Sequence, residues 1–143
     1  RIIYDDYAHH PNEIKATIDL ARLFIKDKKN SNNEQRGRLI AIFQPHRFSR
    51  VRQFINEFAQ ELSKADVIYL TNIFGAGEKS IENINSQLIA KLIYKKNKNV
   101  KCLKDNYEIK DKFFKLTKRN DFILNMGAGD CHNLWSILND QIL

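Results

Sequence analysis

The sequence predicts an α/β fold of the doubly wound, Rossmann-like type, with a mostly parallel sheet of about five to six strands and helices on both faces. Short runs of apolar and β-branched residues recur along the chain and are typical of buried strands. Between them lie stretches with apolar residues three or four positions apart, the spacing of helices. The chain has 143 residues, 43% of them hydrophobic, which is the size of one ordinary domain.

The strand-like segments favour β-branched and apolar side chains. In chain order they are Ile2–Tyr4, Leu39–Gln44, Val67–Thr71, Val100–Leu103 and Phe122–Met126. Strand and helix patterns alternate over residues 1–143 without an internal repeat or a candidate boundary, so we expect a single domain.

The helix-like segments show apolar residues on one face. In chain order they are Ile14–Ile25, Phe54–Leu62, Ile84–Ile93, Tyr107–Leu116 and Cys131–Leu138. Pro11 suits the start of the first helix, where a missing amide costs nothing. The segment Asn30–Gly37 is rich in Asn and predicts a polar surface loop, and Asp66 marks the start of the third strand.

Charge and composition restrict the class of partner. The net charge is +7 and the pI is about 9.4. The lysines are spread along the chain without interleaved exposed aromatics, which disfavours a nucleic-acid partner. The remaining class of partner that the charge favours is an anionic small molecule such as a nucleotide. The apolar runs are far shorter than the ~20 residues that cross a bilayer, so we expect no membrane partner and a cytoplasmic location. Cys102 and Cys131 lack metal-ligand spacing, and no metal site is predicted.

Unusual residues follow four of the predicted strands, where open parallel sheets bind ligands. After the first strand come Asp5, Asp6, Tyr7, His9 and His10; after the second, Gln44, Pro45, His46, Arg47, Ser49, Arg50 and Arg52; after the third, Asn72 and Phe74–Glu78; after the last, Gly127, Ala128, Gly129 and Asp130. Each also has a structural explanation. The aspartates can cap the first helix, the histidines can be surface or core residues, and the glycines can form tight joints.

Arginines dominate the segment after the second strand. Positive side chains in the first turn of a helix oppose the helix dipole, so local stability does not explain them. Arg47 and Arg50 are three residues apart and are expected to share a helical face, where they would bind a carboxylate or phosphate; Arg52 points elsewhere. A structural ion-pair role is the alternative.

Three motifs resemble the C-terminal domain of the Mur ligases: D-D-Y-A-H-H-P-N-E-I at Asp5–Ile14, F-Q-P-H-R-F-S-R at Phe43–Arg50 and M-G-A-G-D at Met126–Asp130. Their order and spacing match over essentially the whole chain. The first motif is similar in folylpolyglutamate synthases, whereas the doubled histidine and the second motif resemble the alanine-adding branch. Asn12 and Phe48 depart from the usual Thr and Tyr.

The resemblance implies an enzyme of peptidoglycan precursor synthesis that uses ATP to activate UDP-N-acetylmuramate as an acyl phosphate, which the amine of L-alanine attacks. By the same resemblance, Tyr7, His9, Arg47 and Arg50 would surround L-alanine, and Asp6 would contact the nucleotide. Weaker cleft candidates, placed by residue type or by resemblance, are Asp5, His10, His46, Gly127, Gly129 and Asp130.

The sequence contains no G-x-x-x-x-G-K-[ST] loop and no evident magnesium carboxylates. The resemblance therefore implies that ATP and Mg²⁺ are bound mainly by a central domain and the UDP group by an N-terminal domain of the same enzyme. We expect Arg1 to lie near a domain boundary and residues 1–143 to be inactive alone. Another Mur or folylpolyglutamate-type ligase, or a non-catalytic nucleotide-binding module, remains an alternative.

Overall fold

The strands lie side by side in one parallel sheet. The computed structural model describes residues 1–32, 37–132, 134, 136 and 138. Within them the strands have the order β1-β5-β2-β3-β4, and every pair is parallel. Their bounds are β1 Ile2–Asp6, β2 Leu39–Phe43, β3 Val67–Leu70, β4 Val100–Cys102 and β5 Phe122–Met126. Each predicted strand is confirmed. β1 continues to Asp6 because Met126 of β5 still pairs with it there.

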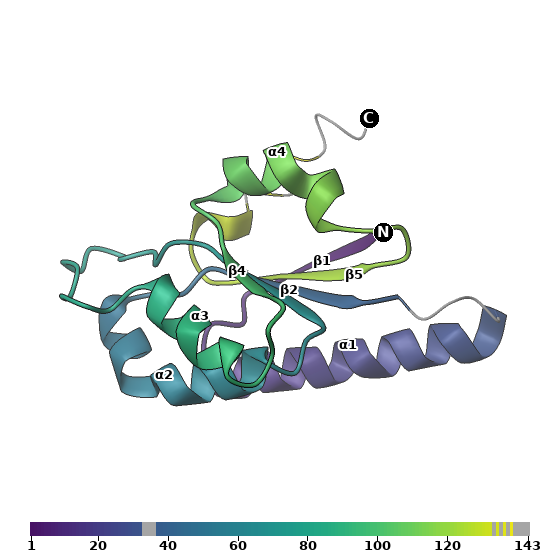
Figure 1. The fold of residues 1–143 in the computed structure, drawn as a ribbon, viewed down its shortest axis with the longest axis horizontal. Coiled ribbons are helices and arrows are strands. Elements are labelled where there is room, and N and C mark those ends of the chain that lie inside the picture. The colour runs from purple at the N-terminus through teal and green to yellow at the C-terminus, as the bar shows by residue number, and fades with distance from the viewer. Residues whose placement is uncertain (33–36, 133, 135, 137, 139–143) are drawn as a thin grey trace.

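Helices cover both faces of the sheet, as predicted. The bounds are α1 Pro11–Asn32, α2 Phe48–Leu62, α3 Ser86–Tyr94, α4 Asn106–Leu116 and the 3₁₀ turn η1 Asp130–His132. Helices α1, α2 and α3 lie on one face and α4 on the other (Figure 1). The predicted helix Cys131–Leu138 lies partly outside the described residues. The predicted loop Asn30–Gly37 is wrong at its start, because α1 continues to Asn32, and residues 33–36 lie outside the described residues.

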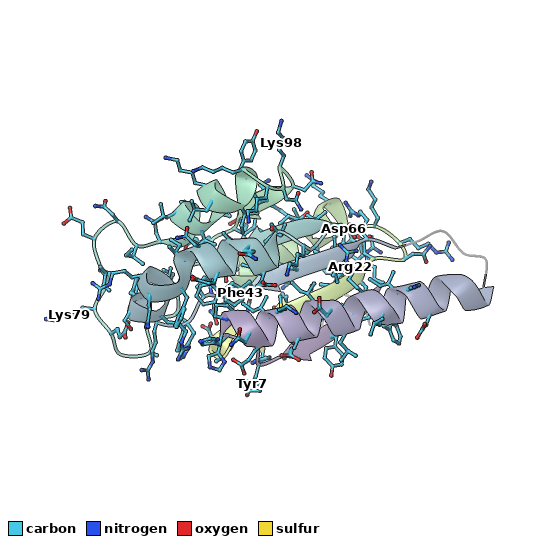
Figure 2. The ribbon with its side chains drawn as sticks, turned by 90° about the horizontal axis from the view of Figure 1, so that it is seen from below. Tyr7, Arg22, Phe43, Asp66, Lys79 and Lys98 are labelled. Atoms are coloured by element: carbon cyan, nitrogen blue, oxygen red, sulfur yellow. The ribbon has the colours of Figure 1, made fainter. Side chains whose placement is uncertain are left out.

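The core consists of two apolar layers that share the central strands. In β2, Leu39, Ala41 and Phe43 face α1, α2 and α3, whereas Ile40 and Ile42 face α4. All five residues are at most 2% exposed, because successive side chains of a strand point to opposite faces and both faces are covered. Phe43 is fully buried on the face of the sheet that α1, α2 and α3 cover, and Figure 2 shows it among these helices.

Side-chain caps explain where two of the helices begin. The Asn85 side chain accepts a hydrogen bond from Leu88 N, so α3 begins at Ser86 rather than at Ile84 as predicted. The Asp105 carboxylate accepts from the backbone amides that open α4, which begins one residue before the predicted start.

An ion pair ties α1 to the start of β3. Asp66 Oδ2 accepts from Arg22 Nη1 at 2.8 Å and from Leu39 N at 2.7 Å, so this carboxylate also contacts the first residue of β2 (Figure 2). Among the described residues, no helix combines the length and apolar character needed to cross a membrane.

Candidate functional site

Main-chain hydrogen bonds join the carboxyl ends of the strands that the sequence singled out. Gly127 N donates to Asp6 O at 3.1 Å, which links the segment after β5 to the end of β1. Gln44 N donates to Met126 O at 3.0 Å, which links the segment after β2 to the end of β5. The predicted gathering of these segments at one edge of the sheet is confirmed.

The segment after β3 joins the same edge. Phe74 N donates to Pro45 O and Arg47 N donates to Phe74 O, both at 2.8 Å, and His46 pairs with Phe74 as an isolated parallel bridge. The ring of His46 stacks on that of Phe74 with a centroid distance of 5.7 Å and an interplanar angle of 15°. Residues after β2 and β3 are therefore held together by both backbone and ring contacts.

Four cationic or titratable residues form what we call the histidine–arginine cluster: His9, His46, Arg47 and Arg50. The rings of His9 and His46 lie 5.9 Å apart, edge to face. Arg50 Nη1 lies 3.3 Å from His46 Nδ1. Arg47 is exposed, and its charge acts on His46 together with those of Arg50 and His9. The structure therefore brings together residues from two distant motifs.

Tyr7 lies apart from this cluster in its ring contacts. It is 68% exposed and contacts His132, with 4.3 Å between the ring centroids. Figure 2 shows its side chain projecting away from the body of the molecule. Its carbonyl oxygen is 2.7 Å from His9 Nδ1, so the backbone of Tyr7, rather than its ring, helps to orient His9.

Arg47 does not occupy the first helical turn, and the prediction that it shares a helical face with Arg50 is wrong. Helix α2 begins at Phe48, and Arg47 is the residue before it, with φ 69° and ψ 129°. The His46–Phe74 bridge keeps the chain extended up to this point, so the turn into the helix falls on Arg47. A positive φ is unusual for a residue with a side chain and is tolerated where surrounding contacts fix the backbone.

The start of α2 already contacts the carboxylate of Glu78, a role that the sequence did not indicate for this residue. Glu78 Oε1 accepts from Ser49 N at 3.1 Å, and Glu78 Oε2 accepts from Ser49 Oγ at 2.5 Å. These hydrogen bonds, with the charge of Arg47, lower the pKa of Glu78. Because the Arg47 side chain makes no capping hydrogen bond, Glu78 caps the helix from another segment. The helix dipole alone is therefore not evidence for a bound anion.

The surroundings of His46 favour its neutral form. Burial lowers its pKa below the ordinary value of 6.5, and the charges of Arg50, His9 and Arg47 lower it further, against a weaker opposite effect of Glu78. Its Nδ1 faces a guanidinium N–H donor and therefore accepts, which places the ring proton on Nε2. His46 thus offers an N–H donor to a ligand without adding a positive charge.

The two aspartates of the first motif do not cap α1. Asp6 Oδ1 accepts from Ala8 N at 2.7 Å, a local turn that fixes the carboxylate just after β1. Asp5 is exposed, and its Oδ1 accepts from Asn125 Nδ2 at 2.9 Å. Asn125 itself is fully buried in β5, so Asp5 is tied to the centre of the sheet.

His10 is the residue that caps α1. Its Nδ1 accepts from Asn12 N at 3.4 Å, and its own N–H donates to Glu13 Oε1 at 3.1 Å, as in a capping box. Pro11 opens the helix, as predicted. The ring of His10 also packs edge to face on Phe54, with centroids 4.8 Å apart. These contacts give His10 a structural role.

Close packing explains the glycines after β5. A Cβ on Gly127, whose φ is 152°, would lie 2.7 Å from Cys131 Sγ, and one on Gly129 would lie 2.6 Å from Gln44 Oε1. The Gln44 side chain donates to Asp130 Oδ1 and accepts from Cys131 N at 3.2 Å. The glycines thus let the turn approach Gln44, which supports the structural explanation of the Gly-Ala-Gly sequence.

A pocket of about 390 Å³ opens at the carboxyl ends of β2, β3, β4 and β5. It is lined by Gln44, Thr71, Asn72, Ile73, Phe74, Lys104, Asp105, Asn106, Tyr107 and Asp130. The residues after β4 were not among the predicted site residues, although Asp105, two residues before the helical pattern that begins at Tyr107, is a recognisable signal of a helix start.

The described residues offer no ready-made metal site. Nowhere among them do three His, Cys, Asp or Glu side chains form a group that could hold a metal. In the histidine–arginine cluster the neighbouring guanidinium groups repel cations. The cluster is suited to an anion, because guanidinium groups bind carboxylates and phosphates through paired N–H donors.

Comparisons with known proteins identify relatives of the chain in sequence and in fold. The chain is 82% identical over 141 residues to the UDP-N-acetylmuramate–L-alanine ligase of Prochlorococcus marinus subsp. pastoris and 41% identical over 143 residues to that of a Synechococcus species. Each alignment covers 99% of this chain but 30% of the relative, so the chain spans about a third of the length of these relatives.

Solved structures share the fold. A UDP-N-acetylmuramate–alanine ligase from Thermotoga maritima has a TM-score of 0.70 at 23% identity, covering 97% of this chain and 26% of that one. A murein peptide ligase from Psychrobacter arcticus has a TM-score of 0.70 at 21% identity, covering 96% and 26%. A family model described as the Mur ligase, glutamate ligase domain matches residues 1–129. That match contains the whole sheet and the histidine–arginine cluster, and the chain belongs to the Mur ligase, glutamate ligase domain family.

Proposed function

We propose that residues 1–143 are one domain, the C-terminal domain, of a cytoplasmic ligase that joins L-alanine to UDP-N-acetylmuramate at the expense of ATP. The domain would supply the amino-acid site of the enzyme. The observation that carries this proposal is the histidine–arginine cluster, in which Arg47 and Arg50 stand beside a neutral His46 at the carboxyl edge of the sheet. The names of the two relatives compared above support the choice of L-alanine and UDP-N-acetylmuramate.

In this proposal Arg47 and Arg50 bind the carboxylate of L-alanine. Within the described part of the chain, the Arg47 side chain makes no hydrogen bond or ion pair, so its donors are available to a ligand. His9 and His46 lie beside this position and Tyr7 at its margin, which suits a substrate with a small side chain. Holding the carboxylate orients the amine toward the acyl phosphate that it attacks, with release of phosphate.

Asp6 would bind the ATP that activates the other substrate. Its Oδ1 is fixed by Ala8 N, which leaves the second oxygen to accept a ribose hydroxyl. The ATP phosphates and Mg²⁺ would be bound mainly by a central domain and the UDP group by an N-terminal domain, because the described residues offer no metal-binding group. These domains would be the partners of this chain, with no nucleic-acid or membrane partner, and the chain alone would be inactive.

Steady-state kinetics of the full-length protein test this function. ADP formation should require both UDP-N-acetylmuramate and L-alanine. Arg47→Ala and Arg50→Ala should each raise the KM for L-alanine by about 10- to 100-fold, the loss expected from one or two charge-assisted hydrogen bonds. Arg52→Ala is the matched control, since Arg52 is exposed on the same helix. Unchanged alanine kinetics in both cluster variants would refute the assigned roles.

Two further measurements separate the alternatives. Another Mur or folylpolyglutamate-type ligase would show ADP formation with a different amino acid or peptide in place of L-alanine. A nucleotide-binding module would bind ATP with micromolar affinity as the 143-residue chain alone, which calorimetry detects. We expect weak or no ATP binding by the isolated chain, because it carries no phosphate-binding loop.

A further inference from the structure

We propose that Glu78 is a positioning residue for the Arg47–Arg50 pair, a role that rests on the proposed function of that pair. Glu78 lies in the segment between β3 and α3, far in sequence from the arginines. Both of its carboxylate oxygens accept hydrogen bonds from Ser49, which stands between Arg47 and Arg50 in the chain. Glu78 therefore fixes one of the two residues that separate Arg47 from Arg50 in the chain.

The segment around Glu78 is built to reach this position. Glu78 N donates to Gly75 O at 3.0 Å, closing a tight turn in which Ala76 and Gly77 have positive φ values of 52° and 87°. Just before this turn, Phe74 accepts a hydrogen bond from Arg47 N. The same segment thus contacts the chain on both sides of the Arg47 backbone, first through Phe74 and then through Glu78.

The geometry also keeps Glu78 from competing with a substrate. Both oxygens are engaged by Ser49, and within the part of the chain that the structure describes no ion pair joins Glu78 to Arg47 or Arg50. Its negative charge nevertheless lies close enough to interact with that of Arg47. Glu78 therefore offsets repulsion between the neighbouring cations and leaves their N–H donors to an incoming carboxylate.

A role in helix stability alone is the competing explanation, and a second carboxylate in the same chain serves as the matched control. Glu108 accepts from Lys104 N at 2.6 Å near the start of α4 and, like Glu78, is held by a backbone amide and a side chain. It takes no part in the histidine–arginine cluster. Glu108→Ala therefore removes comparable local contacts without affecting the arginine pair.

The test uses the full-length protein and begins with alanine-dependent ADP formation by the wild type. A wild-type protein without this activity would refute the proposed function itself, independently of Glu78. Glu78→Ala should raise the KM for L-alanine by about tenfold while the KM for ATP changes less than about twofold, because a misplaced binding group weakens one substrate selectively. Glu108→Ala should change neither value by more than about twofold.

A double-mutant cycle shows whether Glu78 acts through the arginines. On an Arg47→Ala background, Glu78→Ala should add less than about threefold to the KM for L-alanine, because one of the two groups that it positions is already gone. Glu78→Gln, which keeps an oxygen acceptor for Ser49 N, should fold even where the alanine variant does not, and should raise the alanine KM by about threefold. An unchanged alanine KM in both Glu78 variants, an equal rise for every substrate, or a full tenfold effect on the Arg47→Ala background would overturn the proposal.

Discussion

Adding one methyl group at Gly129 should destabilise the domain by about 2 kcal/mol, within the range of ~1–3 kcal/mol for overpacking a filled site. The new Cβ would lie 2.6 Å from Gln44 Oε1 and 2.7 Å from Phe74 Cγ. Neither neighbour can move freely. Gln44 is held by hydrogen bonds to Asp130 and Cys131, and Phe74 by two backbone bonds and its stack on a histidine ring.

Urea unfolding of the purified 143-residue chain, followed by far-UV circular dichroism, measures this cost. Gly77→Ala is the matched control, because a Cβ there would meet no atom within 4 Å but would sit at a φ of 87°. It should cost about 1 kcal/mol, from backbone strain alone. The full-length Gly129→Ala protein should also lose affinity for L-alanine, since Phe74 supports His46. A Gly129→Ala chain within about 0.5 kcal/mol of wild type would show that the contact reasoning is wrong.

Two further predictions concern charged groups. Asp121→Ala should lower the free energy of unfolding by about 3 kcal/mol in the same urea assay, because Asp121 is 2% exposed and accepts two hydrogen bonds from the partly exposed Arg38. Asp19→Ala, which breaks an exposed ion pair, should change the free energy of unfolding by less than about 0.5 kcal/mol. Equal effects of the two substitutions would contradict the expected influence of burial. The NMR-measured pKa of His46 should lie below 6.5 and rise in Arg50→Ala. Between the lowered pKa and 6.5 the unfolded state binds more protons, so stability should rise with pH there; a His46 pKa at or above 6.5 would refute this.

The strands were predictable because central parallel strands are buried on both faces. The segments Leu39–Phe43 and Phe122–Met126 are almost continuously apolar, and both lie in the middle of the sheet. The sequence also indicated which strand ends would meet, because the carboxyl ends of parallel strands lie at the same edge of a sheet, where ligands bind. It did not indicate that the last strand lies between the first two, because this order depends on the crossover through α4.

The details of the site were less predictable, because they depend on contacts between segments far apart in sequence. Nothing adjacent to Arg47 signals that it precedes the helix; the bridge between His46 and Phe74 decides that. In the same way, the carboxylate of Glu78 reaches Ser49 only through the turn after β3. An acidic group from another segment stands at the start of α2, so the dipole of that helix does not by itself require a bound anion.

The support for an anion site at the arginines now has a different physical basis. A carboxylate is present at the start of α2, yet both of its oxygens are occupied by Ser49, so it caps the helix without consuming the donors of Arg47. The cluster thus separates helix capping from ligand binding. Backbone bonds between strand ends hold its parts, including Arg47 N to Phe74 O, so the backbone that carries these side chains is fixed before a ligand binds. Such preorganisation lowers the entropy cost of binding, which matters most for a substrate as small as an amino acid.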